Sequence, residues 1–364
     1  MNTTRQLQEL GQSLWLDNIS REMLNTGTLS NYIENFSITG LTSNPTIFEQ
    51  AIGSSASYDD DIRKKAATDK SHEALFIELA LDDLRRAADL FLPIFNASNG
   101  IDGWVSMEVS PLLANDTAGS LAAAKMIHAQ ADRPNLFVKI PGTQEGVIAI
   151  EEAIFAGVPI NVTLLFSPAQ YLAVAEAYMR GIERRIVAGL NPKIESVASL
   201  FVSRWDAAVA DKVPAELHNL LGIAIGQGAY RSYRKLLASE RWKKLVQQGA
   251  HPQRLLWAST GSKDPKASDT LYIEALIAPG TINTMPEKTL LAFSDHGSVG
   301  AELAVHGGDS EAMLAQFAQA GIDINALAAR LQREGALSFV KSWQQLMQRI
   351  ASKSQTLADN GRDL

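Results

Sequence analysis

The sequence predicts an α/β protein whose strands close into a (β/α)8 barrel, with additional helices, notably at the C-terminus. Eight short apolar runs alternate with segments of helical periodicity, a pattern typical of parallel βαβ units. Eight such units can close into a barrel, and an open doubly wound sheet is the alternative. No repeat, low-complexity segment or linker divides the chain. We therefore expect one domain over residues 1–364, with a helical extension over 309–357 packed on the barrel.

The strands are predicted from runs rich in apolar and β-branched residues that are bounded by turn residues. In chain order they cover residues 13–17, 37–42, 103–109, 136–140, 158–163, 196–202, 254–258 and 281–285. The fourth run contains a lysine near its carboxyl end.

Helices in the first half are predicted from proline, glycine and capping residues. Residues 18–36 form a helix broken at Gly27, and Pro45 suits the first position of the next one. Residues 72–91 form a long amphipathic helix that ends at Pro93, and an alanine-rich helix covers 117–130.

Further helices follow in the second half. Thr143 caps a helix that ends at Gly157, and Ser167 opens another that Gly189 follows. Two or more helices fill residues 205–249. The segment 309–357 is helical, with interruptions at glycines 321 and 335.

Composition excludes several classes of function. The net charge of −7 argues against nucleic-acid and anionic-membrane partners, and the absence of cysteine excludes thiolate catalysis and disulfides. The first ten residues lack the apolar core of a signal peptide, and no apolar run approaches the length of a membrane span. We therefore expect a cytoplasmic protein.

Lys139 is the residue around which the chemistry is predicted. It lies near the end of the fourth strand, before a Pro-Gly turn. Burial disfavours an ammonium ion, and a free amine is the nucleophile of Schiff-base chemistry. The alternative is a lysine whose stem packs while its head group reaches water.

Other polar residues gather at the carboxyl ends of the predicted strands, where a barrel carries its active site. They are Asp17, Asn44, Glu108, Asn161, Thr163 and Ser199, with Arg204 and Lys263 just beyond strands six and seven. Each has a structural alternative: Asp17 can cap a helix, Asn44 can serve a turn, and Glu108 can belong to a salt bridge. Arg204 and Lys263 can be solvated surface charges.

Together these residues suit class I aldolase chemistry. A lysine amine attacks a ketose carbonyl, carboxylates move protons, and late cations hold a phosphate. No metal or cofactor is expected, because the histidines lack zinc-ligand spacing and no nucleotide-binding motif is present. We interpret the acidic run at residues 59–61 as solvated.

Three segments resemble motifs of the transaldolase family, in its longer bacterial type. They are Gly40-Leu-Thr-Ser-Asn-Pro-Thr-Ile-Phe48, Trp104-Val-Ser-Met-Glu-Val-Ser-Pro111 and Phe137-Val-Lys-Ile-Pro-Gly-Thr-Gln-Glu-Gly146. The resemblance implies a transferase of the non-oxidative pentose phosphate pathway that uses no cofactor. It would move a dihydroxyacetone unit from sedoheptulose 7-phosphate to glyceraldehyde 3-phosphate, giving erythrose 4-phosphate and fructose 6-phosphate.

The resemblance also implies roles for individual residues. Lys139 would form the Schiff base, Glu108 would act through a water held by Thr163, and Asp17 would handle a hydroxyl proton. The residues expected to bind substrate are Asn44, Asn161, Ser199, Phe201, Arg204, Ser259 and Lys263. The family's arginine after strand seven is replaced here, in Ala258-Ser-Thr-Gly-Ser-Lys263, and we assign the phosphate to Lys263 instead.

Two rival functions remain open. A fructose 6-phosphate aldolase uses the same scaffold and releases free dihydroxyacetone. Such aldolases have glutamine where this chain has Glu108 and tyrosine where it has Phe201, so both positions favour the transferase. The other rival is a sugar-phosphate-binding protein without turnover. For the transaldolase and for both rival functions, we expect a monomer or homodimer that binds small sugar phosphates.

Overall fold

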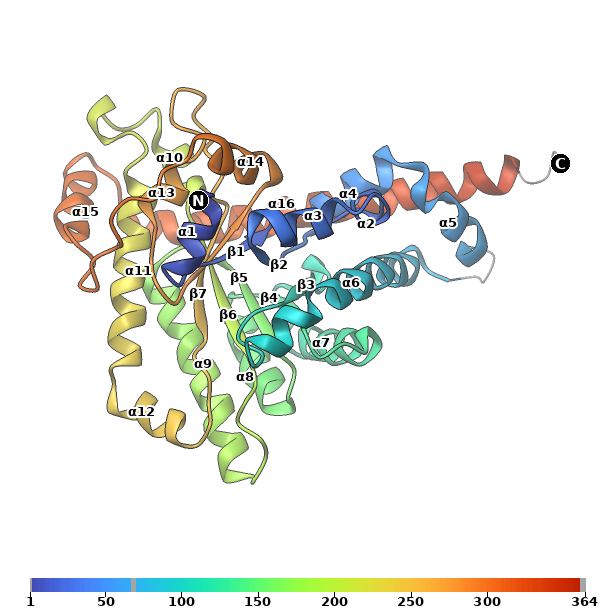
Figure 1. Ribbon diagram of the computed structural model, residues 1–364, viewed down its shortest axis with the longest axis horizontal. Coiled ribbons are helices and arrows are strands. Elements are labelled where there is room, and N and C mark those ends of the chain that lie inside the picture. Colours follow the sequence, from blue (N-terminus) through green and yellow to red (C-terminus); the bar gives the residue numbers. More distant parts are fainter. Residues whose placement is uncertain (1, 67–69, 361–364) are drawn as a thin grey trace.

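Eight parallel strands form a nearly closed barrel in the computed structural model, which describes residues 2–66 and 70–360. The strands follow the order β2-β1-β8-β7-β6-β5-β4-β3, and helices surround them (Figure 1). This arrangement confirms the predicted (β/α)8 TIM barrel. The strands are β1 (Ser13–Leu16), β2 (Ile38–Leu41), β3 (Val105–Glu108), β4 (Leu136–Pro141), β5 (Ile160–Leu165), β6 (Ser196–Phe201), β7 (Arg254–Ala258) and β8 (Ile282–Met285).

The helices cover the outside of the barrel and its carboxyl end. In the first half they are α1 (Thr3–Glu9), α2 (Arg21–Asn25), α3 (Thr28–Phe36), α4 (Pro45–Ser54), α5 (Asp59–Ala66), α6 (His72–Ala97), α7 (Thr117–Ala131) and α8 (Gln144–Ala156). In the second half they are α9 (Pro168–Val187), α10 (Ser203–Val209), α11 (Leu221–Leu237), α12 (Glu240–Gln247), α13 (Leu271–Ala275), α14 (Glu287–His296), α15 (Ser310–Gln319) and α16 (Ile324–Asn360). Short 3-10 turns are η1 (Ala56–Tyr58), η2 (Pro111–Leu113) and η3 (Ala215–Leu217).

The register of three neighbouring strands sets the positions of the polar residues inside the barrel. Lys139 on β4 pairs with Glu108 on β3 and with Asn161 on β5. Because partners in register lie side by side on one face of a sheet, these three side chains share one level of the barrel.

The seam between β2 and β3 is the weakest part of the barrel wall. The two strands are joined by a single bridge between Gly40 and Trp104. A Cβ at Gly40 would lie 2.7 Å from both the Trp104 carbonyl oxygen and the Trp15 indole nitrogen, so only glycine allows this approach.

The amino end of the barrel is closed by a buried polar network. The Trp15 indole donates to Asp102 at 2.8 Å, Ser13 also donates to Asp102, and Arg254 donates to Ser13 at 2.6 Å. All polar members are satisfied by one another, which keeps this end of the barrel structural rather than open.

One predicted helix end and one predicted helix interruption are wrong, because packing overrides the local signals. Helix α6 continues past Pro93 to Ala97, since Phe91, Ile94 and Phe95 keep packing against the core. Helix α16 also continues through Gly335, where the missing side chain lets Leu164 and Arg204 approach the helix.

The prediction that the acidic run at residues 59–61 is solvated holds for Asp60, which is exposed, but not for Asp59 and Asp61, which are partly buried. The run forms the first turn of α5, where acidic groups complement the helix dipole. Asp61 pairs with Arg21 at 2.5 Å, and Asp59 pairs with Lys353 of α16 at 2.6 Å.

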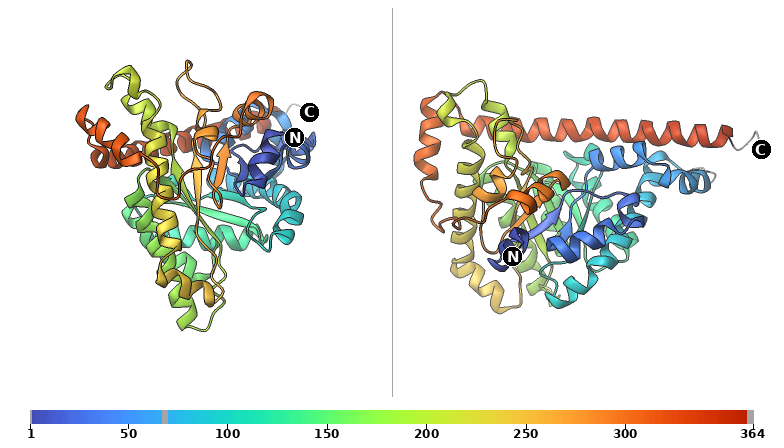
Figure 2. Two further views of the ribbon diagram at one scale, coloured as in Figure 1. Left: turned by 60° about the vertical axis from the view of Figure 1, so that its left-hand side comes forward. Right: turned by 45° about the horizontal axis from the view of Figure 1, so that its top comes forward.

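Helix α16 is the longest element and spans the molecule (Figures 1 and 2). It contacts α4, α5, α6, η2 and β5, which places it along the carboxyl end of the barrel. Its buried stripe consists of Leu327, Leu331, Phe339, Trp343, Leu346 and Ile350. Arg349 pairs with Glu49 of α4 at 3.1 Å, so the helix is fixed along much of its length. Within residues 2–66 and 70–360, no helix is both long and apolar enough to cross a membrane.

Candidate active site

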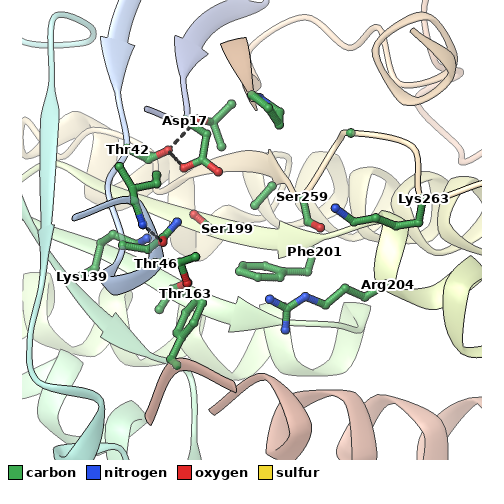
Figure 3. Close-up of a pocket in the computed structure, with 17 residues that line it drawn as sticks. Asp17, Thr42, Thr46, Lys139, Thr163, Ser199, Phe201, Arg204, Ser259 and Lys263 are labelled. Carbon is green, nitrogen blue, oxygen red and sulfur yellow. Dashed lines mark hydrogen bonds between the residues drawn. The ribbon is translucent and has the colours of Figure 1, made fainter. Parts of the chain in front are cut away.

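A pocket of about 230 Å³ lies at the carboxyl end of the barrel, and most of the predicted site residues line it (Figure 3). The predicted residues among its lining are Asp17, Asn44, Lys139, Thr163, Ser199, Phe201, Arg204, Ser259 and Lys263. Glu108 and Asn161 do not line the pocket but lie directly behind Lys139 through the strand register. The structure therefore brings the whole predicted set into one region.

Lys139 is held at the floor of this pocket rather than reaching bulk water. Only 5% of the residue is exposed. Its Nζ donates to the Ser43 carbonyl oxygen at 2.9 Å and lies 3.4 Å from Oε2 of Glu108. The amine thus has a defined direction, with one carboxylate within reach for proton exchange.

Both carboxyls near the amine are shifted toward their protonated forms. Burial raises the pKa of Glu108, and the opposing charge of Lys139 offsets this only in part. Burial likewise raises the pKa of Asp17, against the lowering effects of Lys139 and of the hydrogen bond from Thr42. Carboxyls with raised pKa values are suited to take up and return protons near neutral pH.

The Asp17 carboxylate is oriented by a chain of hydroxyls. The Thr42 hydroxyl lies 2.7 Å from Asp17 Oδ1 (Figure 3) and 2.7 Å from the hydroxyl of Thr284 on β8. Because the Thr42 hydroxyl donates to the carboxylate, it accepts from Thr284.

Two buried oxygen atoms near Lys139 lack a hydrogen-bond partner among the described residues. They are Oε2 of Glu108, which has only the ion pair, and Oγ1 of Thr163. Buried polar atoms are normally paired with protein or water, so this part of the site suits a small polar molecule.

Asn161 is placed as a support beneath the pocket. Its side chain donates to Ser106 Oγ at 3.1 Å and accepts from Ser199 Oγ at 2.7 Å. The residue is fully buried. Ser199, which lines the pocket, is therefore the member of this pair that can reach a ligand directly.

The pocket also contains two cations that form no ion pair with any described carboxylate, Arg204 and Lys263. The Arg204 guanidinium lies 5.0 Å from the Phe201 ring centre and 5.8 Å from that of Phe339. Burial lowers the pKa of Arg204, and Glu108 opposes this effect. A half-buried cation beside aromatic rings is a binding group for an anion such as phosphate.

Two further predicted residues take positions that their neighbours define. Asn44 caps α4 by accepting from the Ile47 amide at 3.1 Å, so its structural role and its place in the pocket coexist. Ser259 has a left-handed backbone with φ of 55° and shares a 2.9 Å hydroxyl contact with Ser203.

Sequence reasoning missed four lining residues that matter to this geometry: Thr42, Thr46, Thr284 and Phe339. Thr42 and Thr46 lie on either side of Asn44 in the segment after β2, so the motif that indicated Asn44 could also have indicated these two threonines. Thr284 falls at the end of the predicted eighth strand and could have been found by the same rule. Phe339 had no local signal, because it comes from a helix predicted only to pack on the barrel.

Over the part of the chain that the structure describes, no group of three histidine, aspartate or glutamate side chains is arranged to hold a metal ion.

The chain matches known proteins along nearly its whole length. A family model described as transaldolase/fructose-6-phosphate aldolase matches residues 14–350. A protein named transaldolase from Thiobacillus denitrificans is 43% identical over 358 residues, covering 96% of this chain and 100% of that protein. A transaldolase from Frankia alni is 44% identical, covering 100% of this chain and 99% of that protein.

The raised pKa of Asp17 gives a pH-dependent prediction. The contribution of Asp17 to the free energy of unfolding is fully present below the ordinary aspartate pKa. It is lost as the pH rises through the higher pKa that Asp17 has in the folded state. Asp17→Asn removes this loss, so its melting temperature relative to that of the unmodified protein should rise as the pH increases from 4 toward 8 and level off above the folded-state pKa, with a total gain of about 1–3 °C.

Differential scanning fluorimetry across this range measures the effect. The matched control is Asp60→Asn, because the Asp60 side chain is 82% exposed. A difference that stays constant with pH would contradict the assignment of a raised pKa to Asp17.

Proposed function

The chain belongs to the transaldolase/fructose-6-phosphate aldolase family and is a transaldolase, and from this premise we propose its substrates and the roles of its residues. The proposed reaction moves a dihydroxyacetone unit from sedoheptulose 7-phosphate to glyceraldehyde 3-phosphate, a step of the non-oxidative pentose phosphate pathway. The observation that carries the mechanism is the Lys139 amine, buried in the pocket 3.4 Å from Glu108.

The first step is formation of a Schiff base at Lys139. Its proton passes to Glu108, whose raised pKa favours accepting it, and the free amine adds to the ketose carbonyl carbon. Glu108 then returns this proton to the former carbonyl oxygen and relays a second proton to it from the attacking nitrogen, so that the oxygen leaves as water and an iminium remains. The unpaired oxygens of Glu108 and Thr163 support a water molecule between them as the carrier of these protons.

The second step is cleavage of the carbon–carbon bond next to the iminium. The Asp17 carboxylate takes the proton of the hydroxyl on the fourth carbon, and the bond between the third and fourth carbons breaks. Its electron pair moves into the iminium and gives an enamine, while erythrose 4-phosphate leaves as the aldehyde. Thr42 keeps the carboxylate of Asp17 turned toward the substrate.

The third step reverses the second with the new aldehyde. The enamine carbon attacks the carbonyl carbon of glyceraldehyde 3-phosphate, and Asp17 returns its proton to the forming alkoxide. Hydrolysis of the resulting iminium, through the same water position, releases fructose 6-phosphate and restores the Lys139 amine.

Arg204 and Lys263 bind the phosphate in this proposal. Both line the pocket, and neither forms an ion pair with a described carboxylate. Arg204 offers a flat guanidinium fixed by Phe201, and Lys263 acts as a point charge from the loop after β7. Ser199, Asn44 and Ser259 supply hydrogen bonds to the three-carbon unit.

We also propose that the chain forms a single domain in which residues 309–357 belong to the barrel. The contacts of α16 with α4, α5, α6 and β5 support this organisation.

Covalent trapping tests the nucleophile. Sodium borohydride with fructose 6-phosphate should reduce the iminium and attach a hexose phosphate to Lys139, because only an imine is reduced to a stable secondary amine. Intact-mass measurement and peptide mapping locate the label. Lys353→Ala, which removes a lysine of α16 far from the pocket, should label as the unmodified protein does, whereas labelling that persists in Lys139→Ala would refute the assignment.

The acceptor requirement separates transfer from simple cleavage. With fructose 6-phosphate alone, we expect a burst of about one glyceraldehyde 3-phosphate per active site, because the enamine waits for an aldehyde. Erythrose 4-phosphate should restore continuous turnover, followed with a coupled dehydrogenase assay. Continuous release without an acceptor would identify a fructose 6-phosphate aldolase, and no release at all would identify a binding protein without turnover.

Replacement of the carboxylate tests its role in proton transfer. Glu108→Gln should lower kcat by about 10²–10⁴-fold with a smaller effect on KM, because general acid–base catalysis is lost while the pocket lining stays the same. Steady-state kinetics with both substrates measure this. Glu216→Gln on the outer turn η3 serves as the control. Nearly unchanged turnover in Glu108→Gln would make Glu108 a structural partner of Lys139.

A further inference from the structure

Helix α16 reaches the active site through a glutamine whose amide joins two strand ends. The side-chain nitrogen of Gln332 donates to the Gly142 carbonyl oxygen at 2.8 Å and to the Leu164 carbonyl oxygen at 3.0 Å. Gly142 follows β4 and Leu164 lies near the end of β5. Both hydrogens of one amide group are therefore used to connect the segments that carry Lys139 and Thr163.

The backbone at Leu164 is strained at this point. Its φ is 59°, a left-handed conformation that costs a residue with a Cβ some free energy. The pairing of β5 with β6 also shifts register between Val162 and Leu165. A strained residue persists only where its surroundings fix it, and the hydrogen bond from Gln332 is one of the contacts that fix Leu164.

The same strand ends are already linked on their other side. The Gly142 amide donates to the Thr163 carbonyl oxygen at 2.8 Å. Gln332 of α16 therefore binds the carbonyl oxygens of Gly142 and Leu164, while the bond from the Gly142 amide to Thr163 joins the two strand ends directly. Thr163, directly before Leu164, cannot change direction without breaking one of these bonds.

Other residues on the same face of α16 contact the same site. At Gly335, one turn further along, an added Cβ would lie 2.8 Å from Leu164 Cδ2 and 3.1 Å from Nη1 of Arg204. Phe339, another turn along, lines the pocket and lies beside the Arg204 guanidinium. This face of the helix is thus fitted to the pocket and not to the barrel in general.

We propose that Gln332 is a positioning residue of the active site, which acts by fixing the directions of Thr163 and Lys139. The inference rests on the proposed function of those two residues. Gln332 touches neither the reacting atoms nor the amine, so its effect on the reaction passes through the two carbonyl groups that it binds.

The proposal is tested with Gln332→Glu, which keeps the shape of the side chain and removes its donors. An ionised carboxylate would face two carbonyl oxygens, so we expect kcat to fall by about 10- to 100-fold at pH 8 with little change in the KM for fructose 6-phosphate. A protonated carboxyl regains one donor, so the loss relative to the unmodified enzyme should shrink toward pH 6.

Two further variants make the comparison specific. Gln332→Met removes both donors without adding a charge, and its loss of kcat should not depend on pH. Gln345→Glu adds the same charge at an exposed position of α16 and should behave as the unmodified enzyme. Thermal unfolding of each variant is followed by circular dichroism under the assay conditions.

The outcomes are distinguishable. If the unmodified enzyme neither transfers nor traps substrate at Lys139, the proposed function itself fails. If it does both and Gln332→Glu keeps its kcat, only the positioning role is overturned. The positioning role of Gln332 is also overturned by a second result. In that result both Gln332 variants lose activity only in proportion to their unfolded fraction, and both keep the pH profile of the unmodified enzyme.

Discussion

The ion pair between Lys139 and Glu108 is the interaction on which the rest of the site depends. Each partner is almost completely buried, and a buried charge is tolerated only with a partner and further hydrogen bonds. The strand register supplies the partner, and the Ser43 carbonyl supplies the hydrogen bond. Burial of this ion pair costs desolvation free energy. As a result, the Lys139 amine is held in one orientation beside a proton acceptor.

Charge in the pocket is divided into two regions. Asp17 and Lys139 line the pocket, with Glu108 beside the Lys139 amine, whereas Arg204 and Lys263 line it without forming an ion pair with a described carboxylate. A ligand with a carbonyl at one end and a phosphate at the other fits this division. In the proposed function, this division of charge orients the sugar phosphate in the pocket.

Much of the fold and of the site followed from the sequence because the signals were local. Parallel strands end at the same face of a barrel, so a polar residue at a strand end can be assigned to that face without knowing any contact. This rule correctly brought Asp17, Lys139 and Ser199 to one pocket. The contribution of α16 could not be predicted, because Gln332 and Phe339 contact residues that lie between 135 and 190 positions away in the chain. Pro93 and Gly335 misled the prediction for a related reason, since burial of a helix face outweighed their local preference.

The weak seam between β2 and β3 has a consequence for the way the chain reaches its final form. Helix α16 contacts α4, which follows β2, and also η2 and α6, which lie on either side of β3. A long helix that is synthesised after all eight strands thus contacts segments on both sides of this seam. At about 5–20 residues per second, a ribosome needs roughly 10–30 s to proceed from β6 to the end of this helix. During that interval the nascent polypeptide holds Lys139 in a ring that still lacks β7, β8 and α16, so the contacts of α16 with α4, α6 and η2 form only after the strands have been synthesised.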